Sequence, residues 1–309
     1  MADAILHIKD AYYFDVPRTV WRSNLTSLEQ VPGYLREGHP HASLDEFNEA
    51  LHGKVLIPQP FGTLRNMYER ESGFCISKFM IIELLIGAVL VFLFSRLAAK
   101  LKRGEVPRGK SWNFLESMVV FIRDEVARPA IGGHDADKFL PILWTMFFFI
   151  LGCNLFGMLP WLGAPTGSFG VTVALAGITF CTVLISGMMK FGVVGYWFNQ
   201  VPHMDLPLLL SPLKIMIFVI EVVGTCIKNG VLAIRLLANM VAGHLVLLAV
   251  MGLAFSLEGA ASSGWWLTAV ISILGSTLFS LLELFVAFLQ AYIFTFLSAL
   301  FIGAAIHHH

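Results

Sequence analysis

Five long apolar segments constrain the fold of this chain more than any other feature. They span about 74–100, 138–163, 171–190, 213–257 and 265–306. Crossing about 30 Å of hydrocarbon takes about 20 residues of helix, so each segment is long enough. Of the 309 residues, 57% are hydrophobic and only 14% are charged, whereas a soluble domain carries about 25% charged residues. The sequence predicts an all-α polytopic membrane protein with about five membrane-embedded helices.

Positive charge predicts the orientation. Lysine and arginine crowd the far end of the first apolar segment, at Arg96, Lys100, Lys102, Arg103, Arg108 and Lys110. By the positive-inside rule this end is cytoplasmic, so the N-terminus lies outside and, after five spans, the C-terminus lies inside. In residues 111–130 apolar residues recur at helical spacing opposite charged ones, which predicts an amphipathic helix on the inner face.

These features divide the chain into seven parts. We expect an extramembrane arm over 1–73, poorly structured because prolines interrupt it, with one short helix near 43–53. The other parts are a transmembrane helix over 74–103, a cytoplasmic loop with the amphipathic helix over 104–137, a transmembrane hairpin over 138–191, a cytoplasmic loop over 192–212, a tilted helix hairpin over 213–306 that carries the ion path, and a frayed tail over 307–309.

The last two segments are too long to stand upright. At 1.5 Å per residue each would reach about 60 Å, twice the hydrocarbon thickness, so each must tilt strongly or break. Ser262 to Gly264 form the only turn between them, which makes an antiparallel hairpin. Residues at equal depth in such a hairpin lie at equal distances in sequence from the turn. Arg235 then lies opposite Gln290, and His244 opposite Glu283, about 10–14 Å nearer the outside.

Placing the charged side chain of Arg235 in the middle of the bilayer costs about 2.5–3.5 kcal/mol on insertion scales. Glu221, Lys228 and Arg235 are seven residues apart and share one stripe of the helix. No acid in this chain lies at the depth of Arg235, which favours a partner carboxylate on another protein. The alternative is purely structural: interhelical hydrogen bonds, an ion pair, and a Lys228 that snorkels to the membrane surface.

Three motifs resemble subunit a of the F-type rotary ATP synthase. They are RLLANMVAGHL at 235–245, LELFVAFLQAYIFTFL at 282–297 and CNLFGMLP at 153–160, within a similarity over about 74–306. By this resemblance Arg235 is the arginine that faces the carboxylate of the rotating c-ring. The resemblance further implies that polar residues line two half-channels, namely Asn154, Glu221, Asn239 and Gln290.

Three positions depart from the pattern of many bacterial relatives. His244 stands where those relatives carry an acid, and Glu283 where they carry a histidine, an arrangement that resembles mitochondrial members. Gly157 stands where some relatives carry an acid. We expect His244 and Glu283 to act as one proton relay in the outer half-channel, since a neighbouring imidazole and carboxylate exchange protons near neutral pH.

The resemblance implies a stator subunit that carries protons, or sodium ions, through two offset half-channels to and from the c-ring. The expected partners are the oligomeric c-ring, subunit b of the peripheral stalk, the rest of the complex and the lipid bilayer, with no nucleic acid, cofactor or metal. The subunit by itself is not expected to be an enzyme. The expected location is the bacterial inner membrane, with an organelle inner membrane as the second choice.

Two other protein classes remain open from the residues alone. A secondary transporter with a buried Arg/Glu/His site would require broken helices and repeats, which are not found in the sequence. An intramembrane metalloprotease built on His244 and Glu283 would require a ligand motif such as HExxH, which is also not found.

Overall fold

Long helices dominate the computed structural model, which describes residues 10–17, 19, 21, 23–102, 109–159, 162–199, 211–255 and 265–307. Within these residues, five helices are long and apolar enough to cross a membrane. They are α4 (Lys78–Lys102), α7 (Ala136–Gly157), α8 (Phe169–Phe191), α10 (Ser211–Phe255) and α11 (Trp265–Ile306). The predicted all-α polytopic class is confirmed.

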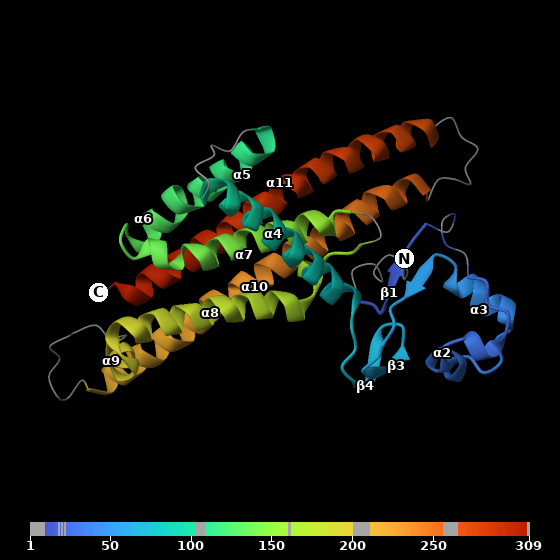
Figure 1. Ribbon diagram of the computed structural model, residues 1–309, viewed down its shortest axis with the longest axis horizontal. Coiled ribbons are helices and arrows are strands. Elements are labelled where there is room, and N and C mark those ends of the chain that lie inside the picture. The colour runs from blue at the N-terminus through green and yellow to red at the C-terminus, as the bar shows by residue number, and fades with distance from the viewer. Residues whose placement is uncertain are drawn as a thin grey trace.

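Helices α10 and α11 are unbroken over 45 and 42 residues. At 1.5 Å per residue they are about 60–70 Å long, so only a strong tilt can fit them into a bilayer. They run antiparallel in contact with one another and extend beyond α7 and α8 (Figure 1). Near the end of the pair the Ser272 hydroxyl donates to the Val250 carbonyl. The predicted turn at 262–264 lies outside the described residues.

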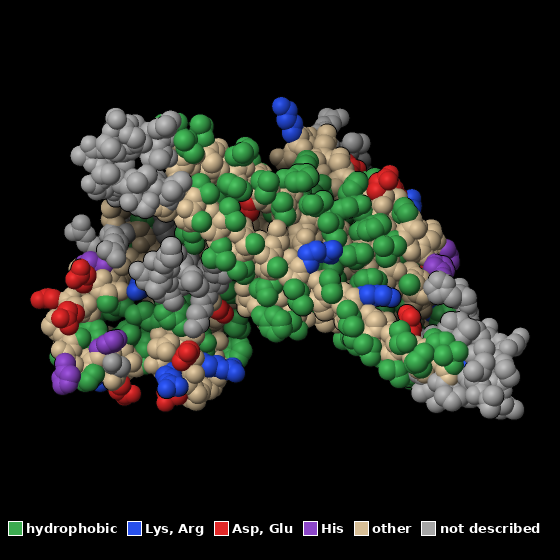
Figure 2. Space-filling model, turned by 180° about the vertical axis from the view of Figure 1, so that it is seen from behind, with side chains coloured by type: hydrophobic (Ala, Val, Ile, Leu, Met, Phe, Trp, Pro, Cys, Tyr) green, Lys and Arg blue, Asp and Glu red, His purple; other side chains and the backbone are tan. Residues whose placement is uncertain are grey.

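The main core lies where α7, α8, α10 and α11 meet. Ile150, Leu232, Leu236 and Phe294 are fully buried there and belong to one apolar cluster. A smaller cluster joins α4 to α7 through Phe79, Ile82, Ile86 and Cys153. On the face that Figure 2 shows, hydrophobic side chains cover most of the helical body, whereas charged side chains gather over the arm. This is the surface expected of a chain surrounded by lipid.

The predicted amphipathic segment is helical throughout. It consists of α5 (Lys110–Phe121), a π-helical turn η2 (Ile122–Ala127) and α6 (Arg128–Ile131). Ile122, Val126 and Ile131 are fully buried against α7 and α11, whereas Arg123 and Arg128 pair with Asp124 at 2.9 and 2.7 Å. The second half of the segment is therefore part of the bundle.

Two expectations, one for the region 192–212 and one for the C-terminal tail, are wrong. The region 192–212, expected as a loop, begins with a further short helix, α9 (Val193–Asn199). Tyr196 of α9 is buried and lies close to Gly187 of α8, which explains why this turn of helix is held. The tail is not frayed at its first residue, because Nε2 of His307 lies 2.7 Å from the Ile131 carbonyl oxygen.

The arm is folded, which corrects the prediction that it is poorly structured. It contains two antiparallel pairs, β1 (Tyr13–Asp15) with β2 (Lys54–Leu56) and β3 (Gly62–Asn66) with β4 (Glu69–Gly73). It also contains a 3-10 turn η1 (Leu28–Gln30) and the helices α2 (Gly33–Gly38) and α3 (Leu44–Leu51). The prolines lie between these elements, so they bound the elements instead of preventing them.

A small core holds the arm together. The predicted short helix is confirmed as α3, which starts with a reciprocal cap between Ser43 and Glu46. Val31, Leu35, Phe47 and Leu51 pack together beneath it.

The arm is attached to the start of α4 by backbone and side-chain bonds. The Lys78 amide donates to the Ala11 carbonyl at 2.9 Å, and the Lys78 ammonium lies 3.4 Å from the Asp15 carboxylate. The arm and the Phe255 and Trp265 ends of the long helices lie at one end of the molecule, whereas α9 and the C-terminus lie at the other (Figure 1). This arrangement agrees with the predicted order of crossings.

Candidate functional site

Helices α10 and α11 bring His244 and Glu283 together. Nδ1 of His244 lies 3.6 Å from Oε1 of Glu283, and only 19% and 9% of these side chains are exposed. The predicted pairing of these two residues across the hairpin is confirmed. Gly243 makes the close approach possible, because a Cβ atom there would lie 2.8 Å from Oε1 of Glu283.

Arg235 and Gln290 are not joined in the same way. Among the described residues, Nε and Nη2 of Arg235 and Nε2 of Gln290 are buried without a hydrogen-bond partner. Arg235 is nine residues from His244, which is about half a turn around the helix. Arg235 and His244 therefore leave α10 on different sides. The predicted pairing of Arg235 with Gln290 at equal depth is therefore not realised as a bond.

Asn154 of α7 is linked to α11. It is 2% exposed, and its Nδ2 donates to the Ala287 carbonyl at 3.3 Å, one helical turn beyond Glu283. Its Oδ1 accepts a 2.8 Å hydrogen bond from the hydroxyl of Thr166, in the 3-10 turn η3 (Pro165–Gly167). No sequence pattern points to Thr166, because a threonine in a Pro-Thr-Gly turn is ordinary.

The remaining predicted residues lie along α10. Lys228 Nζ lies 3.9 Å from Oε1 of Glu221, and about half of each side chain is exposed. The shared stripe of these two residues is confirmed, and they precede Arg235 on the side away from the arm. Asn239 is partly buried one turn after Arg235.

The Arg235 turn borders an apolar surface. The exposed side chains recur every three or four residues and belong to Ile220, Val223, Ile227, Val231 and Ile234. A continuous apolar surface of this kind is made for contact with lipid or another protein. The guanidinium thus lies beside a surface that no other described part of this chain covers.

Gly157 has no room for a larger residue. A Cβ atom there would lie 2.7 Å from Cβ of Ala164 and 2.5 Å from Cε of Met240. Cβ of Ala164 is fixed to the backbone and cannot rotate away, so the turn at residue 164 would have to move. An acid does not fit at this position.

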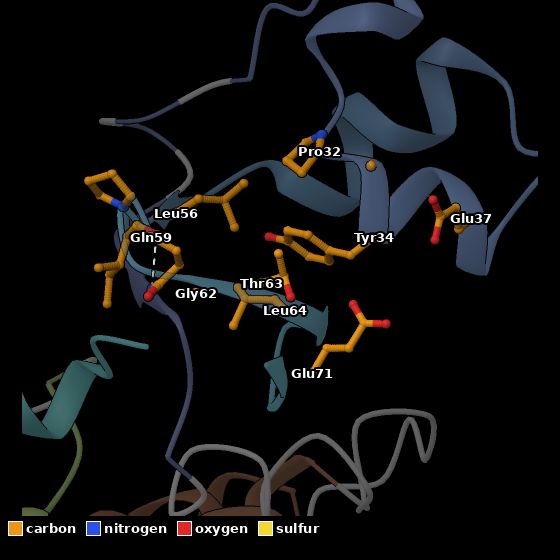
Figure 3. A pocket seen from close by; sticks show the side chains of 12 residues that line it. Pro32, Tyr34, Glu37, Leu56, Gln59, Gly62, Thr63, Leu64 and Glu71 are labelled. Carbon is orange, nitrogen blue, oxygen red and sulfur yellow. Dashed lines mark hydrogen bonds between the residues drawn. The ribbon is translucent and has the colours of Figure 1, made fainter. Parts of the chain in front are cut away.

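A separate cavity lies in the arm, away from these residues. It measures about 510 Å³ and lies between α2 and the β2–β3 segment (Figure 3). Its lining includes Tyr34, Glu37, Thr63 and Glu71. None of the residues predicted to carry ions belongs to it.

Comparison with known proteins identifies the family. The family model described as ATP synthase A chain matches residues 80–303. ATP synthase subunit a of Anaeromyxobacter dehalogenans strain 2CP-1 is 46% identical over 69% of this chain and 53% of its own length. Subunit a of Anaeromyxobacter sp. strain Fw109-5 is 36% identical over 98% of this chain and 70% of its own.

A third relative, ATP synthase subunit a 2 of Chlorobaculum tepidum, is 39% identical over 81% of this chain and 69% of its own length. The chain spans about half the length of the first Anaeromyxobacter relative. With a family match over most of its length and, among the described residues, five helices long and apolar enough to cross a membrane, this multi-pass membrane protein belongs to the ATP synthase A chain family.

Proposed function

We propose that the chain is the stator subunit that carries protons between the two sides of the membrane and the carboxylates of a rotating c-ring. The observation that supports this most is Arg235: a permanent charge whose Nε and Nη2 lack a hydrogen-bond partner among the described residues. It borders an exposed apolar stripe on α10. A buried charge without a partner is costly, so a carboxylate that arrives from a neighbouring protein is the simplest compensation.

In this mechanism protons use two offset paths. The outer path contains Asn154, His244 and Glu283, with Gln290 near its inner end. The inner path contains Glu221, and Asn239 lies beside the arginine. The charge of Arg235 favours deprotonation of the ring carboxylate as it approaches and prevents protons from leaking directly between the paths. Each crossing releases about 2.3 kcal/mol per 100 mV of membrane potential.

The proposal includes partners and orientation. The stripe that includes Ile227, Val231 and Ile234 is the surface for the c-ring, because it flanks Arg235. Subunit b of the peripheral stalk and the rest of the ATP synthase complete the assembly. We place the chain in the bacterial inner membrane with the arm outside and the C-terminus in the cytoplasm, because the positive charges at the end of α4 favour the inside.

The test is Arg235→Ala in the assembled complex, measured in membrane vesicles. We expect ATP-driven proton pumping to be abolished while ATP hydrolysis continues. Arg235→Lys is also expected to fail largely, because an ammonium lacks the planar fork of the guanidinium. Arg96→Ala is the matched control, since Arg96 is exposed and lies over the Phe92 ring at the far end of α4. Normal coupled pumping by Arg235→Ala would disprove the proposal.

A further inference from the structure

Glu83 of α4 is a partly buried acid that the mechanism above does not use. Among the described residues, its Oε1 atom is buried without a hydrogen-bond partner. It lies next to Ile82, which belongs to the apolar cluster that joins α4 to Cys153 of α7. A carboxyl group held in an apolar helix contact costs stability, so its presence calls for a function.

Toward the arm, the next acidic group after Glu83 is Asp10. Asp10 Oδ1 accepts hydrogen bonds from the amides of Ala11 and Phe79, at 3.0 and 3.3 Å. Glu83 is one helical turn beyond Phe79, and helical side chains lean toward the start of the helix, so its carboxyl group points toward Asp10. Burial raises the pKa of Asp10, which helps it to hold a proton.

On the other side, polar groups continue toward α11. The turn η3, which carries Thr166, contacts α4, α7 and α10. Thr166 donates to Asn154 at 2.8 Å, and Asn154 donates to the Ala287 carbonyl at 3.3 Å. Ala287 is one turn from Glu283. A hydroxyl and an amide therefore link η3 and α7 to α11, one turn from the His244–Glu283 pair.

We propose that Glu83 is a proton-carrying residue of the outer half-channel, which exchanges protons between the Asp10 side and the His244–Glu283 pair along a path that Thr166 and Asn154 line. This inference rests on the proposed function. In each passage the carboxylate of Glu83 binds one proton, becomes the neutral acid, and returns to the carboxylate when that proton moves on. Nothing else is transferred.

The test compares Glu83→Gln with Glu83→Asp in the assembled complex in membrane vesicles. Glutamine keeps the size of the side chain and loses the exchangeable acid, whereas aspartate keeps the acid and is shorter. We expect Glu83→Gln to lower ATP-driven proton pumping about tenfold, since a positioned acid–base group contributes at least that much. Glu83→Asp should recover a large part of the pumping. ATP hydrolysis, measured after it has been uncoupled from pumping, should stay normal in both variants.

Two outcomes would overturn the inference: wild-type pumping by Glu83→Gln, or pumping by Glu83→Asp that is no better than by Glu83→Gln, which indicates a packing role. If Glu83→Gln does not assemble, Asp10→Asn replaces it, and wild-type pumping by that variant would also overturn the inference. Glu125→Gln is the control, because Glu125 is exposed in η2 at the other end of the bundle. Arg235→Ala, measured in the same vesicles, separates failure of this inference from failure of the proposed function.

Discussion

The imidazole of His244 and the carboxylate of Glu283 lie 3.6 Å apart, although they belong to different long helices. Glycine at position 243 allows this approach, since its missing side chain leaves room for the Glu283 carboxylate. The two residues face each other at nearly equal distances from the hairpin connection, so the contact depends on both groups and less on which helix carries which.

Exchange of the two residues is the first prediction. His244→Glu places two acids side by side, and Glu283→His removes the acid, so each single change should impair pumping. The double exchange restores one imidazole and one carboxylate and should recover a good part of the activity. Pumping in membrane vesicles is measured for the two singles and the double. A double variant no better than its worse single would show that the residues do not share a site.

A second prediction concerns the space beside the pair. In Gly243→Ala the new Cβ would lie 2.8 Å from Oε1 of Glu283 and 3.3 Å from its Cδ, so the carboxylate must shift away. We expect slower proton pumping with normal assembly, because only the far end of a side chain moves. Gly252→Ala on the same helix is the control, since nothing lies within 4 Å of the added atom. Equal pumping by both variants would contradict the prediction.

Much of this architecture could be predicted from the sequence because long helices have a fixed rise. The five spans follow from the length of the apolar segments, and the His244–Glu283 contact follows from position numbers along two unbroken helices. Equal depth in the membrane does not determine the direction in which a side chain points. Equal distance from the turn places Arg235 opposite Gln290, but Nε and Nη2 of Arg235 and Nε2 of Gln290 have no hydrogen-bond partner among the described residues.

Other features left no usable pattern in the sequence. The strands and helices of the arm are three to eight residues long, too short for a periodicity to appear above the prolines. The Asp10–Phe79 bond and the Thr166–Asn154 bond each join residues whose neighbourhood is decided by tertiary packing. Single acids and hydroxyls of this kind become candidates only when their neighbours are known.

Asp135 gives a prediction on pH dependence. Hydrogen bonds from Lys138 (2.9 Å) and Lys190 (3.1 Å) lower its pKa from 3.8 to about 2. The carboxylate therefore stabilises the contact between α7 and α8 above about pH 4, and this contribution is lost as the pH falls toward 2. We expect Asp135→Asn to lower the thermal unfolding midpoint in detergent slightly at pH 6, with a difference that vanishes near pH 2. A difference that is independent of pH would contradict this, and Glu125→Gln is the control.

The orientation gives a prediction for labelling in intact cells. In a chain without its native cysteines, Ser72→Cys in β4 should react with a membrane-impermeant thiol reagent from outside, because Ser72 is exposed on the arm. Ser117→Cys in α5, also exposed, should react only after the cells are opened. The reverse pattern would exchange the two half-channels.

The close packing of α11 on α6 gives the last prediction. A Cβ atom on Gly303 would overlap the backbone carbonyl oxygen of Ala130 and would lie 3.5 Å from Cα of Ile131. A backbone group cannot rotate out of the way, so in Gly303→Ala α11 must move away from α6. Overpacking of this kind costs about 1–3 kcal/mol. We expect a lower thermal unfolding midpoint in detergent and less assembled complex in membranes.

Gly87→Ala on α4 is the control for that measurement. Nothing lies within 4 Å of its added atom, and alanine is favoured over glycine in a helix by up to about 1 kcal/mol, so its midpoint should be equal or higher. The movement of α11 also weakens the contact between His307 and the Ile131 carbonyl. His307→Ala should therefore cost less in the Gly303→Ala background than in the wild type, and a fully additive loss would show that the two contacts are independent.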